Sequence, residues 1–326
     1  MKRIAILTSG GDAPGMNACI RSVVKTAIGS GMEVMGVLRG YKGLIEDEFI
    51  ALSHKEVSGI MQRGGTVLYT SRCPEFVSKE GQKRALENLK KYEIEGLVVL
   101  GGDGSYAGAI ALAKAGVNVV AIPATIDNDL YYTDHTLGFD TAVNTITSLI
   151  NNIRDTASSH ERPSVIEVMG AYCGDIALNV GAGVGAEIIL VPEVKVTDKQ
   201  IVDAVEKCET IGKSSCMIIT NEKVYDASKL SDLINKRTGV ASRPLEVGHI
   251  QRGGSPSAFD RVLALKFGAC AVKMLVDGKS GAVGDKNGDI IAVELSAALK
   301  GSRQFDYNLY QLALKSAGDV LKLQKP

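Results

Sequence analysis

The sequence contains no tryptophan, no excess of either charge and no long apolar segment. Lys and Arg together number 37, and Asp and Glu together also number 37. The chain therefore lacks the net basic field that attracts nucleic acid or an acidic membrane surface. No apolar run approaches the ~20 residues that cross a bilayer. The run at residues 4–7 is too short for the core of a secretory signal. We therefore expect a cytoplasmic protein that binds neither nucleic acid nor membrane.

The cysteines show no metal-binding or disulfide pattern. None forms a Cys-x-x-Cys pair or a Cys/His cluster with zinc spacing, which predicts free thiols in a reducing compartment. The six are Cys19, Cys73, Cys173, Cys208, Cys216 and Cys270.

Strand-like apolar runs alternate with helical patterns along most of the chain. This alternation predicts an α/β protein with a mostly parallel sheet flanked by helices, and 326 residues suggest about two domains. A capping box at Thr197 and Gln200 predicts a helix start. The predicted strands are 4–7, 96–100, 117–122, 165–169, 187–191, 217–220 and 245–250. The predicted helices cover 19–28, 105–115, 139–153, a segment from 197, and 257–276.

Two glycine turns, each carrying an aspartate, follow predicted strands and precede predicted helices. They are Gly10–Asp12 and Gly101–Ser105. A helix N-terminus presents free N–H groups and a positive dipole end, and glycine lets an anion approach the backbone. One such turn is common in α/β proteins, whereas two favour phosphate binding.

Other nucleotide motifs fail. Residues 211–214 resemble the end of a P-loop, but Lys207 occupies the position of its first glycine. Residues 181–186 fit a dinucleotide fingerprint by letter, yet a strand follows them instead of preceding them. We expect a loop or a tightly packed segment there.

Asp103, Asp127 and Asp129 are the candidate carboxylates for phosphoryl transfer. That reaction needs one carboxylate to hold magnesium and another to accept the proton of the attacking hydroxyl. Asp103 lies within the second glycine turn. If the chain stays extended across Asn128, Asp127 and Asp129 point the same way. The alternative is that these two only form a turn.

Arginine suits phosphate because its planar guanidinium presents a fork of donors. Arg252, in a Gln-Arg-Gly-Gly segment after an apolar run, is the best candidate, and Arg243 before Pro244 is next. The same tetrapeptide occurs at 62–65. Arg21 and Lys25 share the polar face of a helix, where solvation is the alternative to anion binding.

Five motifs in this order resemble bacterial ATP-dependent 6-phosphofructokinases. They are Thr8–Asn17, Gly101–Ser105, Pro123–Asp129, Met169–Asp175 and Gly248–Pro256. The resemblance implies two α/β lobes. A nucleotide-binding lobe would span 1–138 and 256–303, and a sugar-phosphate lobe 139–255 and 304–326. It also implies a homotetramer with active sites shared between subunits. The implied glycolytic reaction transfers the ATP γ-phosphoryl, with Mg²⁺, to the 1-hydroxyl of fructose 6-phosphate.

The resemblance assigns roles residue by residue. It gives Asp103 to the metal, and Asp127, Thr125, Asp129 and Arg72 to catalysis. The nucleotide positions are Gly11, Arg72, Cys73, Gly102, Asp103, Gly104 and Ser105. The substrate positions are Thr125, Asp127, Met169, Gly170, Ala171, Glu222, His249 and Arg252, with Arg162 and Arg243 from a neighbouring subunit. The effector positions are Arg21, Lys25, Arg154, Gly185, Glu187 and Lys213.

The sequence departs from the family pattern at two places. Ala171 stands where the family has an arginine that faces the transferred phosphoryl group. Uncharged or weakly basic residues replace charged ones in the effector site, at His54, Gly59, Ile211 and Ser214. We therefore expect low turnover and weak allostery. Gly104 and Ala124 favour ATP over pyrophosphate as the donor.

Two other functions remain open at this point. A weakly active or non-catalytic regulatory paralogue would fit Ala171 and the thinned effector site, although the aspartates are intact. A NAD kinase shares a Gly-Gly-Asp-Gly turn, but the segments 123–129 and 249–254 argue against it.

Overall fold

The computed structural model describes residues 1–213 and 215–322, which form two compact units. Unit 1 comprises residues 1–126, 130–141 and 252–303. Unit 2 comprises residues 127–129 and 142–251, and continues from residue 304. Ser214 and residues 323–326, which the predicted effector site and second lobe include, lie outside the described residues.

A mostly parallel sheet forms the centre of unit 1. Its strands are β1 (Arg3–Thr8), β2 (Glu33–Val37), β3 (Phe49–Leu52), β4 (Gly96–Gly101), β5 (Asn118–Thr125), β6 (Leu137–Gly138), β11 (Gly281–Lys286) and β12 (Asp289–Val293). The order is β12-β11-β5-β4-β1-β2-β3, and β6 pairs with β5. Only the edge strands β3 and β12 pair antiparallel with their neighbours.

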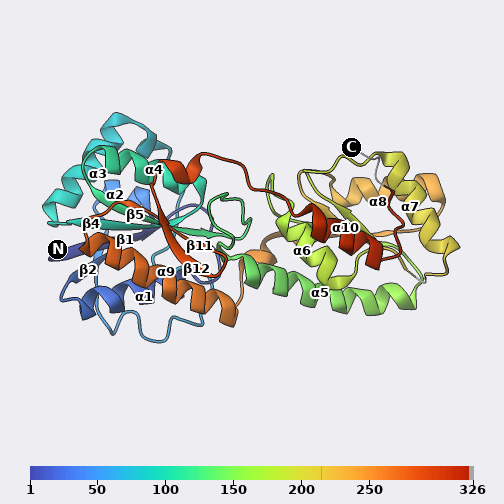
Figure 1. The fold of residues 1–326 in the computed structure, drawn as a ribbon, viewed down its shortest axis with the longest axis horizontal. Coiled ribbons are helices and arrows are strands. Elements are labelled where there is room, and N and C mark those ends of the chain that lie inside the picture. The colour runs from blue at the N-terminus through green and yellow to red at the C-terminus, as the bar shows by residue number, and fades with distance from the viewer. Residues whose placement is uncertain (214, 323–326) are drawn as a thin grey trace. The chain divides into compact units, whose positions relative to one another are not determined.

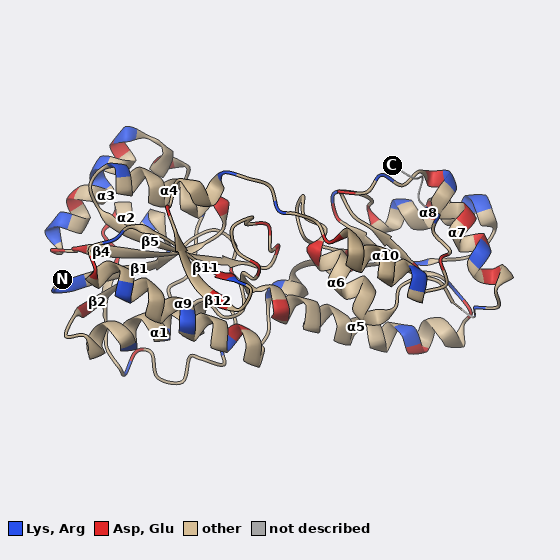
Figure 2. Ribbon diagram, viewed as in Figure 1, with Lys and Arg blue, Asp and Glu red and all other residues tan. Residues whose placement is uncertain are grey.

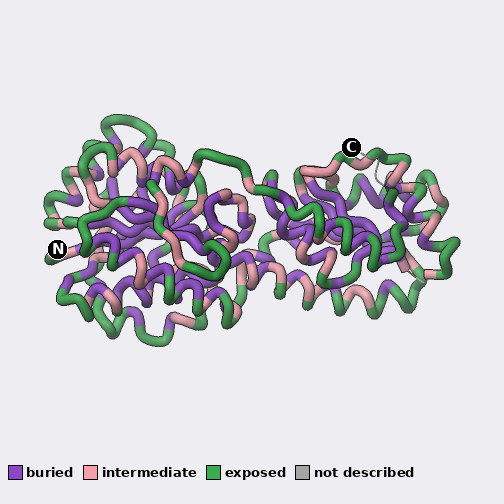
Figure 3. Tube along the Cα trace, viewed as in Figure 1, coloured by how far each residue is buried: buried purple, intermediate pink, exposed green. Residues whose placement is uncertain are grey.

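Helices cover both faces of this sheet. They are α1 (Met16–Gly29), α2 (Tyr41–Glu46), α3 (Lys79–Lys91), α4 (Asp103–Lys114) and α9 (Ala258–Val276), with 3₁₀ turns η1 (Pro74–Val77) and η3 (Ala297–Leu299). Figure 1 shows α1 and α9 together on one face and α2, α3 and α4 on the other. Because helices shield both faces, the central strands are almost wholly buried (Figure 3).

Unit 2 repeats this architecture with fewer strands. Its sheet has the order β10 (Arg243–Glu246), β7 (Ser164–Val168), β9 (Met217–Asn221) and β8 (Ile188–Leu190), all parallel. The helices are α5 (Phe139–Ser159), which starts in unit 1, α6 (Asp175–Val184), α7 (Asp198–Thr210), α8 (Ala227–Thr238) and α10 (Tyr307–Ser316), with the 3₁₀ turn η2 (Gly248–Arg252). The predicted α/β class is confirmed.

Local signals place several helix starts correctly. The capping box exists: the Thr197 hydroxyl accepts from Gln200 N at 3.3 Å, and Gln200 Oε1 accepts from Thr197 N at 2.9 Å. Ser257 caps α9 by accepting from Asp260 N. Charged side chains gather on helices and loops and leave most strand positions neutral (Figure 2).

One segment prediction is wrong, and of the two alternatives for a second segment one holds. The strand predicted at 245–250 ends at Glu246, because Gly248 has φ 58° and the Gln251 amide closes a turn onto its carbonyl at 2.8 Å. Residues 181–184 are helical, so the loop alternative fails. Tight packing holds: a Cβ at Gly181 would lie 2.6 Å from the Ile189 side chain.

None of the helices within residues 1–213 and 215–322 combines the length and the apolar character that spanning a membrane requires.

Candidate active site

The two glycine turns lie side by side at the carboxyl edge of the unit 1 sheet. Strands β1 and β4 are parallel neighbours, with Thr8 opposite Leu100. Beyond that pair, Ser9 N donates to Leu100 O at 2.9 Å. The turns therefore leave the sheet together, and the N-termini of α1 and α4 follow them.

Close backbone approach explains the glycines. Gly10 has φ 85°, in the left-handed region that glycine tolerates. A Cβ at Gly101 would lie 2.5 Å from Ser9 O, so a side chain there would push the turns apart. In contrast, a Cβ at Gly104 would meet no atom within 4 Å. The backbone of Gly104 thus faces open space at the start of α4.

Asp103 is the first residue of α4 and is exposed beside Gly104. Ser105 is buried and its carbonyl accepts from the Tyr41 hydroxyl at 2.6 Å, which holds the first turn of α4 in place. Thr125 ends β5 next to this turn, since a Cβ at Gly102 would lie 3.7 Å from Thr125 Cβ. The predicted nucleotide residues 102–105 and Thr125 are thereby brought together.

The segment that carries Arg72 and Cys73 is tied to the first glycine turn. The Thr70 hydroxyl donates to Gly10 O at 2.6 Å. Arg72 is exposed and Cys73 is half-buried. This hydrogen bond brings the predicted nucleotide-binding segment to the turn that contains Gly11.

Arg252 packs against Gly11. A Cβ at Gly11 would clash with Nη1 of Arg252. Arg252 Nε is buried, and within residues 1–213 and 215–322 it has no hydrogen-bond partner. The two Gln-Arg-Gly-Gly loops also meet, because Ser255 Oγ donates to Gln62 O at 2.7 Å. Arg252, predicted for the sugar phosphate, is therefore adjacent to a predicted nucleotide residue.

The segment Asp127–Asp129 is a turn instead of an extended strand. Asn128 has φ 53°, so the condition of an extended chain is not met and the turn alternative holds. The buried Asn128 amide donates to Asp175 Oδ2 at 2.9 Å. Asp127 and Asp129, both half-buried, flank this anchor.

Several predicted substrate residues meet at the carboxyl edge of the unit 2 sheet. Ala171 N donates to Glu222 Oε1 at 3.2 Å, and Met169 N donates to Gln251 Oε1 at 3.1 Å. Gly170 has φ 134°, and a Cβ there would lie 2.6 Å from Cys173 O. His249 is exposed on η2, the 3₁₀ turn that contains Gln251.

Arg162 and Arg243 lie at the opposite edge of this sheet. Arg243 begins β10 and pairs with Ser164, the first residue of β7, while Arg162 precedes β7. Met169 follows the far end of the same strand. Unit 2 therefore separates these arginines from its own Met169–Ala171 segment.

Four predicted effector residues come together elsewhere in unit 2. Lys213 Nζ donates to Glu187 Oε1 at 2.6 Å, and Met217 N donates to Glu187 Oε2 at 2.7 Å. Arg154 donates to the carbonyl of Val184, the residue before Gly185. Arg21 and Lys25 belong to α1 of unit 1.

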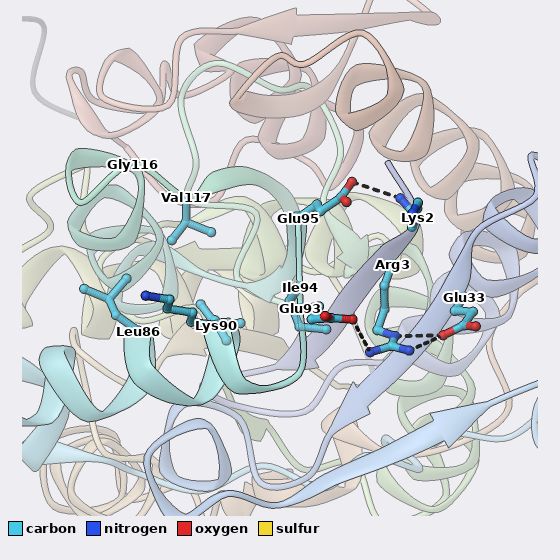
Figure 4. Close-up of a pocket in the computed structure, with 11 residues that line it drawn as sticks. Lys2, Arg3, Glu33, Leu86, Lys90, Glu93, Ile94, Glu95, Gly116 and Val117 are labelled. Carbon is cyan, nitrogen blue, oxygen red and sulfur yellow. Dashed lines mark hydrogen bonds and ion pairs between the residues drawn. The ribbon is translucent and has the colours of Figure 1, made fainter.

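A hollow of about 730 Å³ in unit 1 is a different feature. It lies where β1, β2 and β4 begin, so it is at the opposite edge of the sheet from the glycine turns (Figure 4). Arg3 there is paired with Glu33 and Glu93. None of the predicted nucleotide residues lines it.

Three residues that hold the site in shape carried no recognisable signal in the sequence. Asn128 and Asp175 fix the aspartate turn, and Gln251, fully buried, fixes Met169. All three lie inside the five motifs, and Asn128 and Gln251 adjoin residues that were assigned roles. Asn128 and Gln251 are uncharged amides, and Asp175 accepts a hydrogen bond from Asn128. None of the three therefore matched a catalytic or binding pattern in the sequence.

Comparison with known proteins places the chain in one family. The Phosphofructokinase family matches residues 3–275. An ATP-dependent 6-phosphofructokinase from Clostridium botulinum strain Alaska E43 is 52% identical, covering 96% of this chain and 98% of that relative. The relative from strain Loch Maree is 49% identical with the same coverage.

Solved structures agree on the fold. A phosphofructokinase from Saccharomyces cerevisiae superposes with a TM-score of 0.87 at 31% identity over 99% of this chain, which spans 48% of the yeast chain. A pyrophosphate-dependent phosphofructokinase from Marinobacter aquaeolei has a TM-score of 0.86 over 100% of this chain and 93% of its own, and its 20% identity shows the fold alone. The expectation from the five motifs is confirmed: the chain belongs to the phosphofructokinase family.

Proposed function

We propose that this protein is an ATP-dependent 6-phosphofructokinase, a glycolytic kinase that converts fructose 6-phosphate and ATP to fructose 1,6-bisphosphate and ADP. The observation that carries the proposal is 52% identity, over 96% of the chain, to a relative named for that activity. The regulatory and NAD kinase alternatives have no comparable support.

The paired glycine turns suit the phosphates of ATP. Backbone N–H groups and the positive dipole ends of α1 and α4 favour an anion there. Gly104 leaves open space at the start of α4, where a phosphate can approach the backbone. Magnesium is usually bound through one or two carboxylates plus phosphate oxygens, so the exposed Asp103 fits as its protein ligand. The bound ion would neutralise charge on the phosphates.

Asp127 is the proposed general base. Its role is to accept the proton of the sugar 1-hydroxyl as that oxygen attacks the γ-phosphorus. The Asn128–Asp175 hydrogen bond fixes the turn and so limits the positions of Asp127 and Asp129. Thr125 and Arg72 complete the proposed catalytic set.

Arg252 is the proposed anchor of the sugar phosphate, with Met169, Gly170, Ala171, Glu222 and His249 as further contacts. Its buried Nε has a donor to spare, and a guanidinium binds phosphate through paired donors. Arg252 packs on Gly11, so its guanidinium lies beside the first glycine turn.

Shared sites in a homotetramer would explain Arg162 and Arg243. Both lie at the strand edge opposite Met169 within one chain. A second subunit could present them to the site that Met169 helps to form. This arrangement supports the proposal that each active site takes arginines from a neighbouring copy.

A coupled assay tests the function directly. The enzyme, Mg²⁺ and fructose 6-phosphate are incubated with ATP or with pyrophosphate, and fructose 1,6-bisphosphate is measured through aldolase. We expect product with ATP and little with pyrophosphate, and a large loss in Asp103→Asn. Binding of both ATP and sugar phosphate without product would indicate the regulatory paralogue, and phosphorylation of NAD would indicate the third function.

A further inference from the structure

Two cysteines of unit 2 lie close together in space. Cys208, in the last turn of α7, and Cys216, immediately before β9, have Sγ atoms 2.9 Å apart. Both are free thiols. A disulfide has an S–S length of about 2.05 Å, so bond formation requires an approach of about 0.9 Å.

The backbone already holds the two residues in this relation. Lys213 N donates to Cys208 O at 3.1 Å, and Gly212, with φ 76°, allows the chain to reverse after α7. On the other side, Ser164 N donates to Cys216 O at 2.9 Å as the chain enters the sheet. The helix end and the strand start are therefore positioned independently of the sulfur atoms, and a disulfide would join two fixed points.

We propose that Cys208 and Cys216 form a reversible intrachain disulfide, which makes this pair a redox modification site. The reaction partner is a low-molecular-weight disulfide. One cysteine thiolate attacks this reagent and forms a mixed disulfide with one half of it. The other half of the reagent leaves as a thiol. The thiolate of the other cysteine then attacks the protein sulfur of the mixed disulfide. The remaining half of the reagent leaves as a second thiol. The two cysteine protons and two electrons end on the reduced reagent, so the exchange balances.

The surroundings make this reaction conditional. Cys208 is 1% exposed and Cys216 is 3% exposed, so a reagent reaches them only when the end of α7 opens. The hydrogen bond with Cys208, together with burial, raises the pKa of Cys216, while Lys213 lowers it. The thiolate is the reacting form. The pair therefore stays reduced while the end of α7 covers it, and it reacts when this helix end opens, because opening admits the reagent and removes the burial that raises the pKa of Cys216.

The bond would lock a specific part of unit 2. Lys213, between the two cysteines, donates to Glu187 Oε1 and to Ala317 O at 2.7 Å, and Met217, just after Cys216, donates to the same carboxylate. A disulfide would keep in place both hydrogen bonds to Glu187, the one from Lys213 and the one from Met217. Oxidation should then oppose local opening and raise the thermal stability of the chain.

The test uses the whole protein equilibrated with oxidised glutathione, alkylated in denaturant and mapped by mass spectrometry. Of six thiols, we expect four to remain alkylatable and one linked peptide pair to contain Cys208 and Cys216. The melting temperature should rise by at least about 3 °C and return after reduction. Cys208→Ser should abolish both changes, whereas Cys270→Ser, a half-buried thiol of unit 1, should retain them.

Six alkylatable thiols after oxidation, or a link that involves other cysteines, would overturn the site. A Cys208–Cys216 link without a rise in melting temperature would contradict the claim that the disulfide stabilises this part of unit 2. The linked peptide and the melting temperature are both measured on the unsubstituted protein. These two results therefore stand even if a serine variant folds poorly. Neither depends on the proposed kinase activity.

Discussion

Asp127 and Ala171 are the two residues on which the proposed chemistry depends most. Asp127 lies in a turn whose shape is set by its neighbour, because the left-handed Asn128 donates to the buried Asp175. Replacing the Asp127 carboxylate by an amide removes the base while keeping the side-chain shape. The Asn128 anchor is untouched by that change.

We predict that Asp127→Asn lowers kcat by about 10²–10⁴-fold, the usual contribution of a general base. Fructose 6-phosphate binding, measured by calorimetry, should survive. Asp289→Asn, an exposed aspartate on β12, is the matched control. Wild-type turnover in Asp127→Asn would remove this residue from the mechanism.

The Ala171 backbone is held in the left-handed region, a conformation that alanine already adopts and that an arginine would have to share. It has φ 48°, and its N–H is held by Glu222, so the position is defined without help from the methyl group. The resemblance assigns an arginine to this position, and stabilisation of charge on the moving phosphoryl group is the main source of catalysis in such reactions.

We predict that Ala171→Arg raises kcat at least roughly tenfold, which corresponds to ~1.4 kcal/mol of transition-state stabilisation. The measurement is kcat with saturating ATP, Mg²⁺ and fructose 6-phosphate. Ala171→Met adds length without charge and should give no gain. A fast natural enzyme that the arginine does not improve would show that this position does not limit catalysis.

At the scale of elements, one buried carboxylate joins the starts of α5 and α9. Asp260, in the first turn of α9, accepts from Gly138 N at 3.0 Å through Oδ1 and from Thr141 N at 2.9 Å through Oδ2. The Thr141 hydroxyl donates to Oδ2 as well. Burial raises the pKa of Asp260, and these hydrogen bonds oppose the rise. Both oxygens therefore act as acceptors.

Asp260→Asn turns one acceptor into a donor that faces an N–H group. We predict a loss of about 1–3 kcal/mol in the free energy of unfolding, the cost of a buried donor without a partner. Urea denaturation measures it. Lys266→Gln, exposed on the same helix, should change little. Equal stability of both variants would mean that the start of α5 does not depend on this carboxylate.

The region around Glu187 concerns regulation. The Lys213 ammonium, assigned by resemblance to an effector anion, is already bound by Glu187 and by a carbonyl. His54, Gly59 and Ile211 add little charge. An anion site needs several unpaired donors, so this group should attract phosphate weakly.

We predict little or no response to ADP or phosphoenolpyruvate. The half-saturation for fructose 6-phosphate should stay within about twofold when either ligand is added at sub-millimolar levels, a shift below ~0.4 kcal/mol. Glu187→Gln, which weakens the hold on Lys213, should strengthen any response. A large shift in the natural protein would show that the effector site works as it stands.

At the scale of the whole molecule, the question is whether one chain holds a complete site. Arg162 and Arg243 lie at the far edge of the unit 2 sheet from Met169. If they serve a neighbouring subunit, an Arg243→Ala chain and an Asp127→Asn chain fail for different reasons. Each can then supply what the other lacks.

We predict that mixed oligomers of Arg243→Ala and Asp127→Asn recover activity that neither variant has alone. Differently tagged chains are co-expressed, mixed species are isolated and kcat is measured. Combining Asp127→Asn with Arg72→Ala, two residues expected to act in the same site, serves as a comparison. No recovery in verified mixed oligomers would argue against shared sites.

Local chemistry let the sequence determine the strand–glycine–helix order, the capping box at Thr197 and the family motifs, because each depends on residues close along the chain. Tertiary structure alone decided which distant segments meet. The contact of Arg252 with Gly11 and the approach of Cys208 to Cys216 depend on how strands pair and helices pack, and no local pattern encodes that. Asn128 adopts its left-handed conformation in a turn that the distant Asp175 anchors, so of the two alternatives that the spacing left open, the turn holds and the extended chain does not.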